Sequence, residues 1–201
     1  MSTTPFSDER TTFSNRDAMS EFDRIVNDAV VDLFRAFGLT VRPHHGPMEA
    51  LENTDKTAST AAMLSLSGTE IRGTVSVVAL FDLLASCCPH DKSRPKLSSS
   101  CTTDWNIVRD MAKELVNQLV GRIKNRLSAR GVTFDSRTPT AVSGNAVTGL
   151  LRGHTATRYV FAADTQYVNV FVDVTLTPAG QQKISKSNVN PPIREGEIID
   201  L

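Results

Sequence analysis

The feature that most constrains the fold is a long helical pattern followed by two alternating patterns, which occurs twice along the chain. In residues 19–37, apolar side chains recur every three or four positions, which predicts an amphipathic helix. Residues 58–80 alternate apolar and polar side chains around a turn at 67–70, which predicts a β-hairpin. A second helix is expected over 104–130, and a second hairpin over 158–176. Separate strand pairs beside long helices favour the α+β class, with two long helices packed on an antiparallel sheet.

Local signals predict the smaller elements. Ser20 is interpreted as a capping residue of the first helix, and Gly38 stands where a helix C-terminus favours positive φ. A short helix is expected at 81–85, and the segment 88–103 is interpreted as a loop because it is rich in Pro, Ser and charge. A single strand is expected over 140–148.

Both ends of the chain are predicted to lie outside the folded domain. Residues 1–16 are polar with mixed charge, so they are interpreted as a disordered leader without the apolar segment of a signal peptide. Residues 178–201 are polar with Pro and Gly, and are interpreted as a disordered C-terminal tail rather than a docking segment. No stretch approaches the roughly 20 apolar residues that span a bilayer. A cytoplasmic protein without membrane contact is therefore expected.

Charge and cysteine content exclude several classes of function. The 22 basic and 22 acidic residues cancel, so there is no electrostatic footprint for nucleic acid and no basic run for a membrane surface. Cys87, Cys88 and Cys101 could form a metal cluster with His90, but their spacing matches no common zinc pattern. Buried or unreactive thiols are the favoured interpretation, so we expect no metal site.

The second helix carries an unusual polar face. Its apolar residues fall in one sector, and Asp110, Glu114, Asn117 and Gly121 fall in a narrow sector on the opposite side. Gly121 costs a helix about 1 kcal/mol relative to Ala, and Asn117 is also a mediocre helix former. A glycine lets another backbone come close. An ordinary solvated helix face is the plain alternative.

The spacing of these residues resembles the signature of the CheC/CheX/FliY family of chemotaxis phosphatases. That signature places an Asp or Ser, then Glu, then Asn on one helix, and a Pro after twenty-two further residues. Here the helix positions are Asp110, Glu114 and Asn117, and Pro139 stands 22 positions after the Asn. The order of helices and hairpins over residues 18–177 is also similar to that family.

The resemblance further implies a CheX-like member, which carries the signature once. On the first helix, Glu21 is followed three positions later by Arg24, and Asp23 four positions later by Asn27, so neither pair fits. Residues 17–177 are accordingly interpreted as a CheX-like phosphatase domain. Members of this kind tend to form homodimers.

The family resemblance also implies a reaction, the hydrolysis of a phosphoaspartate on a phosphorylated CheY-like receiver domain. Asn117 would orient the attacking water, and Glu114 would pair with a Lys of the receiver. Asp110 would lie at the edge of the contact, Gly121 would let the receiver loops settle, and Pro139 would fix a turn. The receiver would carry the Mg²⁺, so this protein-aspartyl-phosphate phosphatase would need no cofactor of its own.

Two other functions stay open from the sequence. The domain could bind a receiver or a flagellar-switch component as a scaffold without hydrolysis, because a fold alone does not imply catalysis. It could also be a small-molecule-sensing domain in which the motif is accidental. The presence of both Glu114 and Asn117 favours the enzyme.

Overall fold

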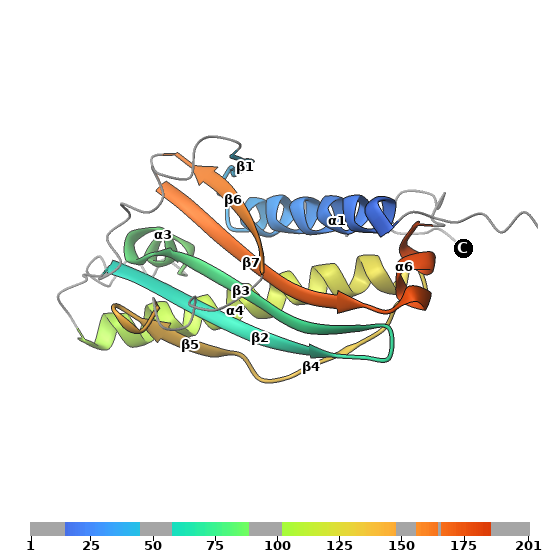
Figure 1. The fold of residues 1–201 in the computed structure, drawn as a ribbon. Coiled ribbons are helices and arrows are strands. Elements are labelled where there is room, and N and C mark those ends of the chain that lie inside the picture. The colour runs from blue at the N-terminus through green and yellow to red at the C-terminus, as the bar shows by residue number, and fades with distance from the viewer. Residues whose placement is uncertain (1–14, 45–57, 89–101, 148–155, 165, 186–201) are drawn as a thin grey trace, which may run out of the picture.

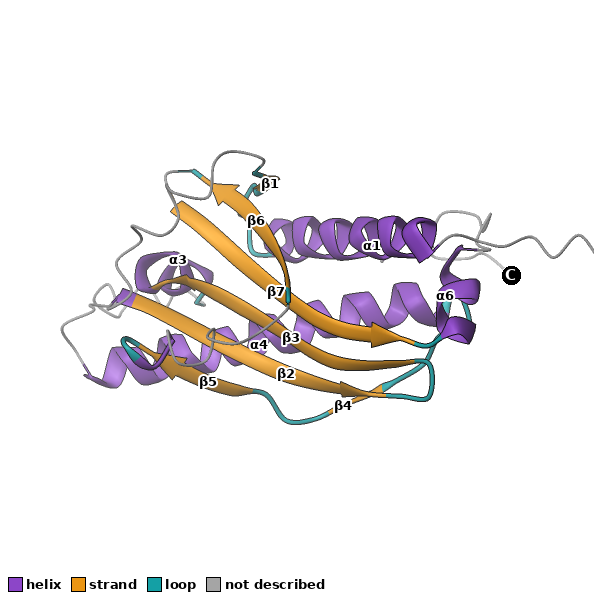
Figure 2. Ribbon diagram, viewed as in Figure 1, coloured by secondary structure: helices purple, strands orange, loops and turns teal. Residues whose placement is uncertain are grey.

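The computed structural model describes residues 15–44, 58–88, 102–147, 156–164 and 166–185 (Figure 1). These residues form one antiparallel sheet with helices packed against it (Figure 2). The elements are α1 (Asn15–Ala36), β1 (Arg42–Pro43), β2 (Ser59–Ser67), β3 (Ile71–Leu80), α3 (Phe81–Cys87), α4 (Thr102–Ser128), β4 (Asp135–Ser136), β5 (Thr140–Ser143), β6 (Thr157–Ala163), β7 (Gln166–Leu176) and α6 (Pro178–Ser185).

The sheet has the strand order β1-β6-β7-β3-β2-β4, and β5 also pairs with β2. Both predicted hairpins are confirmed, as β2–β3 and β6–β7. They join through their second strands, because β3 pairs antiparallel with β7 and Val75 lies opposite Val172. The two halves of the chain therefore share one continuous sheet.

The helices α1 and α4 contact each other and cover one face of this sheet. Alternate residues of the central strands point toward them, as the sequence pattern predicts. The resulting core is large and almost fully closed to solvent. It includes Ala62, Leu64 and Leu66 of β2, Ile71, Val75 and Val77 of β3, Phe22, Leu33 and Phe34 of α1, and Leu115, Leu119 and Ile123 of α4.

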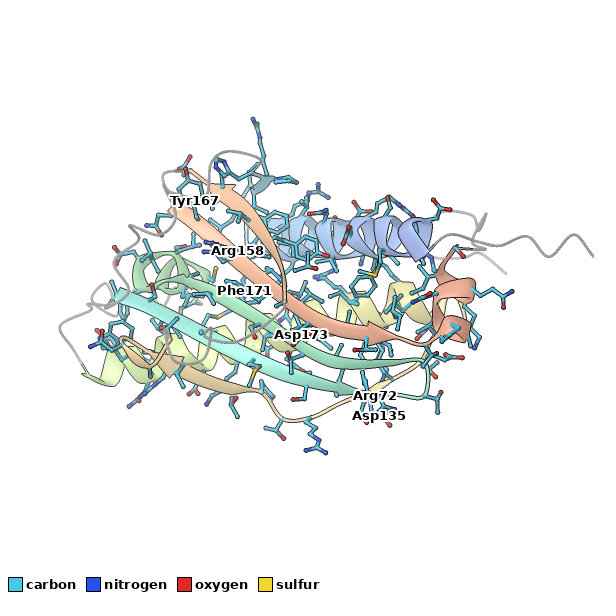
Figure 3. All side chains as sticks on the ribbon, viewed as in Figure 1. Arg72, Asp135, Arg158, Tyr167, Phe171 and Asp173 are labelled. Atoms are coloured by element: carbon cyan, nitrogen blue, oxygen red, sulfur yellow. The ribbon has the colours of Figure 1, made fainter. Side chains whose placement is uncertain are left out.

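The opposite face of the sheet is more polar. Figure 3 shows it toward the viewer, with Arg158 on β6 and with Phe171 and Asp173 on β7. The Arg158 guanidinium lies 5.6 Å from the Phe171 ring centre and donates from Nη2 to Asn169 Oδ1 at 2.8 Å. The two long helices thus bury one face. The other face carries such polar contacts together with a small apolar cluster of Ala61, Val78 and Val147.

The C-terminal segment differs from its prediction. Residues 178–185 were expected in the tail, but they form α6, which packs on α1. Ile184 is fully buried, and Lys183 donates to the Gly131 carbonyl at 2.9 Å. A Cβ on Gly180 would lie 2.7 Å from the Glu70 carbonyl oxygen, so the helix sits close against the β2–β3 turn. A polar sequence forms this helix because two inward residues dock it on the rest of the domain.

Smaller differences concern element ends. α1 begins at Asn15, so Ser20 lies inside the helix and is not its cap. β5 ends at Ser143, which is shorter than the strand expected to 148. Gly38 has φ +74°, as predicted for a residue that follows a helix. Residues 1–14 and 186–201 lie outside the described residues, so the leader and the rest of the tail remain predictions there.

Candidate functional site

The candidate site stands on α4, whose ends and buried stripe are well defined. The helix ends in a turn where Val132 N–H donates to the Leu127 carbonyl at 3.0 Å and Gly131 takes φ +73°. Left-handed backbone of this kind favours glycine. The apolar stripe packs on the sheet and neighbouring helices. It comprises Val108, Met111, Ala112, Leu115, Val116, Leu119, Val120, Ile123 and Leu127.

The polar face predicted for this helix is present. Asp110, Glu114, Asn117 and Gly121 are all exposed on the side of α4 away from its buried stripe. None of the four is needed for packing, because a Cβ on Gly121 would meet nothing within 4 Å and the other three side chains lie in solvent. The helix thus presents an acid, a second acid, a carboxamide and a bare backbone position in succession.

The polar groups on this face are not equally engaged. Lys113 Nζ lies 2.9 Å from Asp110 Oδ1, and Gln118 Nε2 donates to Glu114 Oε1 at 2.7 Å. Within the described part of the chain, the Asn117 carboxamide makes no side-chain hydrogen bond. Both its donors and its acceptor are therefore free for a water molecule or a partner.

Pro139 does not belong to α4 and stands in the segment between β4 and β5. It is half-buried and directly precedes β5, which contacts α4 and pairs with β2. Twenty-one residues separate it from Asn117, one fewer than the twenty-two of the family pattern, so the spacing departs from that pattern by one residue. Its expected role in fixing the turn remains a prediction.

Two acidic residues of α1, Glu21 and Asp32, form ion pairs with arginines of α4 and of the turn that follows it. Glu21 accepts a 2.8 Å hydrogen bond from Arg24 Nε and also pairs with Arg130, in the turn that follows α4. The Arg24 hydrogen bond, and then Arg130, lower the pKa of Glu21 against the opposing effect of burial. Asp32 pairs with Arg126 in the same way. Since Glu21 and Asp32 are used in these ties, α1 has no face like that of α4.

The cysteines do not form a reactive centre in the described structure. Cys87 is buried at the end of α3, and burial raises the pKa of its thiol to about 11. Cys88 is half-buried, and its pKa is raised for the same reason. His90 and Cys101 lie outside the described residues. Across the ranges that the structure describes, no three His, Cys, Asp or Glu residues are grouped to hold a metal, and no helix has the length and apolar character to cross a bilayer.

A recess of about 470 Å³ lies elsewhere on the molecule, and sequence reasoning missed it. Its walls come from the loop after α1, from α3 and from the β6–β7 turn, and include Asp82, Leu83, Asp164 and Gln166. No residue of the α4 face lines it. Its walls come from segments far apart in sequence, so no local pattern announces it.

Neither a protein-family model nor a curated protein matches the sequence. Solved structures do match it. The chemotaxis protein CheX from Vibrio vulnificus is 18% identical, with 77% of this chain and 99% of that chain covered and a TM-score of 0.58. The chain has the CheX fold.

Two further structures share this CheX fold. One is a CheX–CheY–BeF3–Mg²⁺ complex from Borrelia burgdorferi, at 14% identity and a TM-score of 0.55, with 78% of this chain and 97% of that chain covered. The other is a FliM–SpeE complex from H. pylori, at 11% identity and a TM-score of 0.55, with 88% and 98% covered. The CheX-like α+β architecture expected from the sequence is thereby confirmed.

Proposed function

We propose that this chain is a single-motif member of the CheC/CheX/FliY family and hydrolyses phosphoaspartate on a CheY-like receiver domain. One observation carries the proposal. Within a CheX fold, Glu114 and Asn117 stand one turn apart on the exposed face of α4, and the Asn117 side chain makes no hydrogen bond within the described chain. A face that contributes nothing to packing is available to enter another protein's active site.

Asn117 supplies the group that places the nucleophile. Its amide oxygen accepts a hydrogen bond from water while the side chain stays neutral beside the phosphoryl oxygens. The water oxygen attacks phosphorus in line, the acyl P–O bond breaks, and its electrons leave with the aspartate carboxylate. The reaction needs positioning above all, as in phosphoryl transfer generally, and orientation lowers its barrier by several kcal/mol. The receiver provides the Mg²⁺.

Glu114 supplies the contact that sets register. Its carboxylate pairs with the receiver's Lys in a charge-assisted hydrogen bond. Gly121, one turn after Asn117 on the same face, leaves room for the receiver backbone, because the position carries no Cβ. Asp110 lies at the far end, where Lys113 already neutralises it. On this face, Asn117 takes part in the reaction, whereas the other three positions determine how the receiver docks.

The choice of partner is supported by the CheX–CheY complex from Borrelia burgdorferi, whose matched chain has the same fold. We also propose a homodimer in the cytoplasm, on the family resemblance alone. Light scattering at micromolar concentrations tests the dimer, and a monomer at every concentration would remove it.

The alternative function is that of a scaffold, which binds a receiver or a flagellar-switch component without hydrolysis. The occurrence of the same fold in a FliM–SpeE complex favours keeping it. The scaffold and the enzyme differ in one outcome, since only the enzyme releases phosphate from a phosphorylated receiver that it binds.

The deciding experiment measures phosphate release from phosphorylated receivers with wild type and with Asn117→Ala. We expect the variant to lose stimulated release and to keep its circular dichroism spectrum, because the Asn117 side chain is exposed and bonds to no other described side chain. The matched control is Asn125→Ala, an exposed Asn of the same helix that lies about 80° around it. Wild-type phosphate release by Asn117→Ala would contradict the proposed mechanism.

Glu114 gives a second test, with affinity and phosphate release measured in parallel. We expect Glu114→Ala to weaken both, and Glu114→Gln to lie between it and wild type, because it keeps an acceptor but loses the charge. The loss amounts to a few kcal/mol if the receiver's Lys is left unpaired. Binding without release by wild type would favour the scaffold. Undiminished binding and release in Glu114→Ala would remove the Lys contact.

A further inference from the structure

We propose that Gln118 is a positioning residue that holds the Glu114 carboxylate ready for a cationic group of the partner, an inference that rests on the proposed function. Gln118 lies one turn after Glu114 on α4 and is half-buried, whereas Glu114 is exposed. Its Nε2 donates to Glu114 Oε1 at 2.7 Å. The second carboxylate oxygen accepts no hydrogen bond from the described residues and is left for the partner.

The two acids of this face are held in different ways, and the difference indicates which one serves a partner. Asp110 is paired with a cation, because Lys113 Nζ lies 2.9 Å from its carboxylate. Glu114 is held by a neutral amide, which fixes its position and leaves its charge. A Lys at position 118 would make the usual helical ion pair with Glu114 and would compete with any incoming cation. An amide donor avoids that competition.

Ordering Glu114 before binding also lowers the cost of association. A free Glu side chain loses considerable rotamer entropy when it is fixed at an interface. Gln118 is half-buried, so the structure already restricts the group that restricts Glu114. The hydrogen bond therefore prepares the geometry in which the carboxylate meets its partner.

A double-mutant cycle separates this role from a direct contact of Gln118 with the partner. The probe is a CheY-type receiver domain from the same genome, loaded with BeF3 and Mg²⁺ for affinity and phosphorylated for kcat/KM. We expect Gln118→Ala to raise Kd about threefold to tenfold, which corresponds to the net contribution of one typical hydrogen bond. In the Glu114→Ala background, the same substitution should have no further effect, because Gln118 acts through Glu114.

A charge variant sharpens the test. Gln118→Lys should weaken binding more than Gln118→Ala, because the new ammonium neutralises Glu114. The matched controls are Gln182→Ala and Gln182→Lys, at an exposed glutamine of α6. They repeat both chemical changes away from the face and should leave Kd unchanged. An equal loss from Gln118→Ala with and without Glu114, or tight binding by Gln118→Lys, would overturn the inference.

A measurement without the receiver distinguishes failure of this inference from failure of the proposed function. NMR couplings of the Glu114 side chain should show one dominant rotamer in wild type and averaging in Gln118→Ala. Equal averaging in both proteins would overturn the positioning role, whatever the receiver does. An ordered Glu114 in a wild-type protein that neither binds nor dephosphorylates any receiver would instead remove the proposed function.

Discussion

Substituting Gly121 by Ala should make the protein more stable and less active at once. The position is exposed in the middle of α4, and a Cβ built there meets no atom within 4 Å. The methyl group therefore causes no strain in the free protein. Ala is favoured over Gly in a helix interior by about 0.8–1.0 kcal/mol. We expect the free energy of unfolding to rise by about that amount, and Tm by about 2–4 °C for a domain of this size.

The effect on turnover should have the opposite sign. If the receiver backbone settles against Gly121, the added methyl group crowds a packed contact, which typically costs about 1–3 kcal/mol. The corresponding fall in kcat/KM is about 5-fold to 150-fold. Urea unfolding gives the stability, and phosphate release from a phosphorylated receiver gives kcat/KM. Opposite signs for the two measurements are the signature of a residue kept for binding.

The control for this prediction is Ser20→Ala, at an exposed position inside α1. It should raise stability by a few tenths of a kcal/mol through helix propensity alone, with no change in kcat/KM. A Gly121→Ala protein that is stabilised and fully active would refute the close approach of the receiver. A destabilised one would show that the free helix itself requires the glycine.

Two further predictions concern the stability of the fold. Arg24 and then Arg130 hold the pKa of Glu21 below 4.5, so its ion pairs stabilise the fold above that pH and are lost as pH falls through the lowered folded value. Glu21→Gln should therefore lower the free energy of unfolding by about 1 kcal/mol at neutral pH. The difference between wild type and variant should shrink in acid. An equal difference in urea unfolding at pH 7 and pH 3 would contradict this. Gly180→Ala should cost about 1–3 kcal/mol in the same assay, because its Cβ would lie 2.7 Å from the Glu70 carbonyl oxygen, and an unchanged midpoint would show that α6 moves freely.

The parts of the fold that periodicity specifies were predictable. α1, α4 and both hairpins bury one side each, and burial imposes a regular spacing on their apolar residues. α6 was not, because it exists through contact with α1 and the β2–β3 turn and buries only Gly180 and Ile184 of its own residues. Two-residue strands such as β4 are too short to carry a pattern.

The candidate site was predictable as far as helix geometry decides it. The shared face of Glu114 and Asn117 follows from 3.6 residues per turn. The bond from Gln118 to Glu114 also has a sequence signal, since residues four apart on a helix are neighbours, but spacing alone does not say which neighbours will pair. The recess beside α3 gave no signal, because it requires the tertiary arrangement of three segments.

The position of α6 has a consequence for biosynthesis. Its Ile184 is fully buried in the core, and α6 packs against α1, the first described helix of the chain. At about 5–20 residues per second, translation reaches α6 on the order of ten seconds after it completes α1. The nascent chain must therefore carry the apolar stripe of α1 without its last covering element during that time. Ribosome-bound chains stalled before α6 should accordingly bind chaperones that recognise exposed apolar surface, and should release them once α6 has emerged.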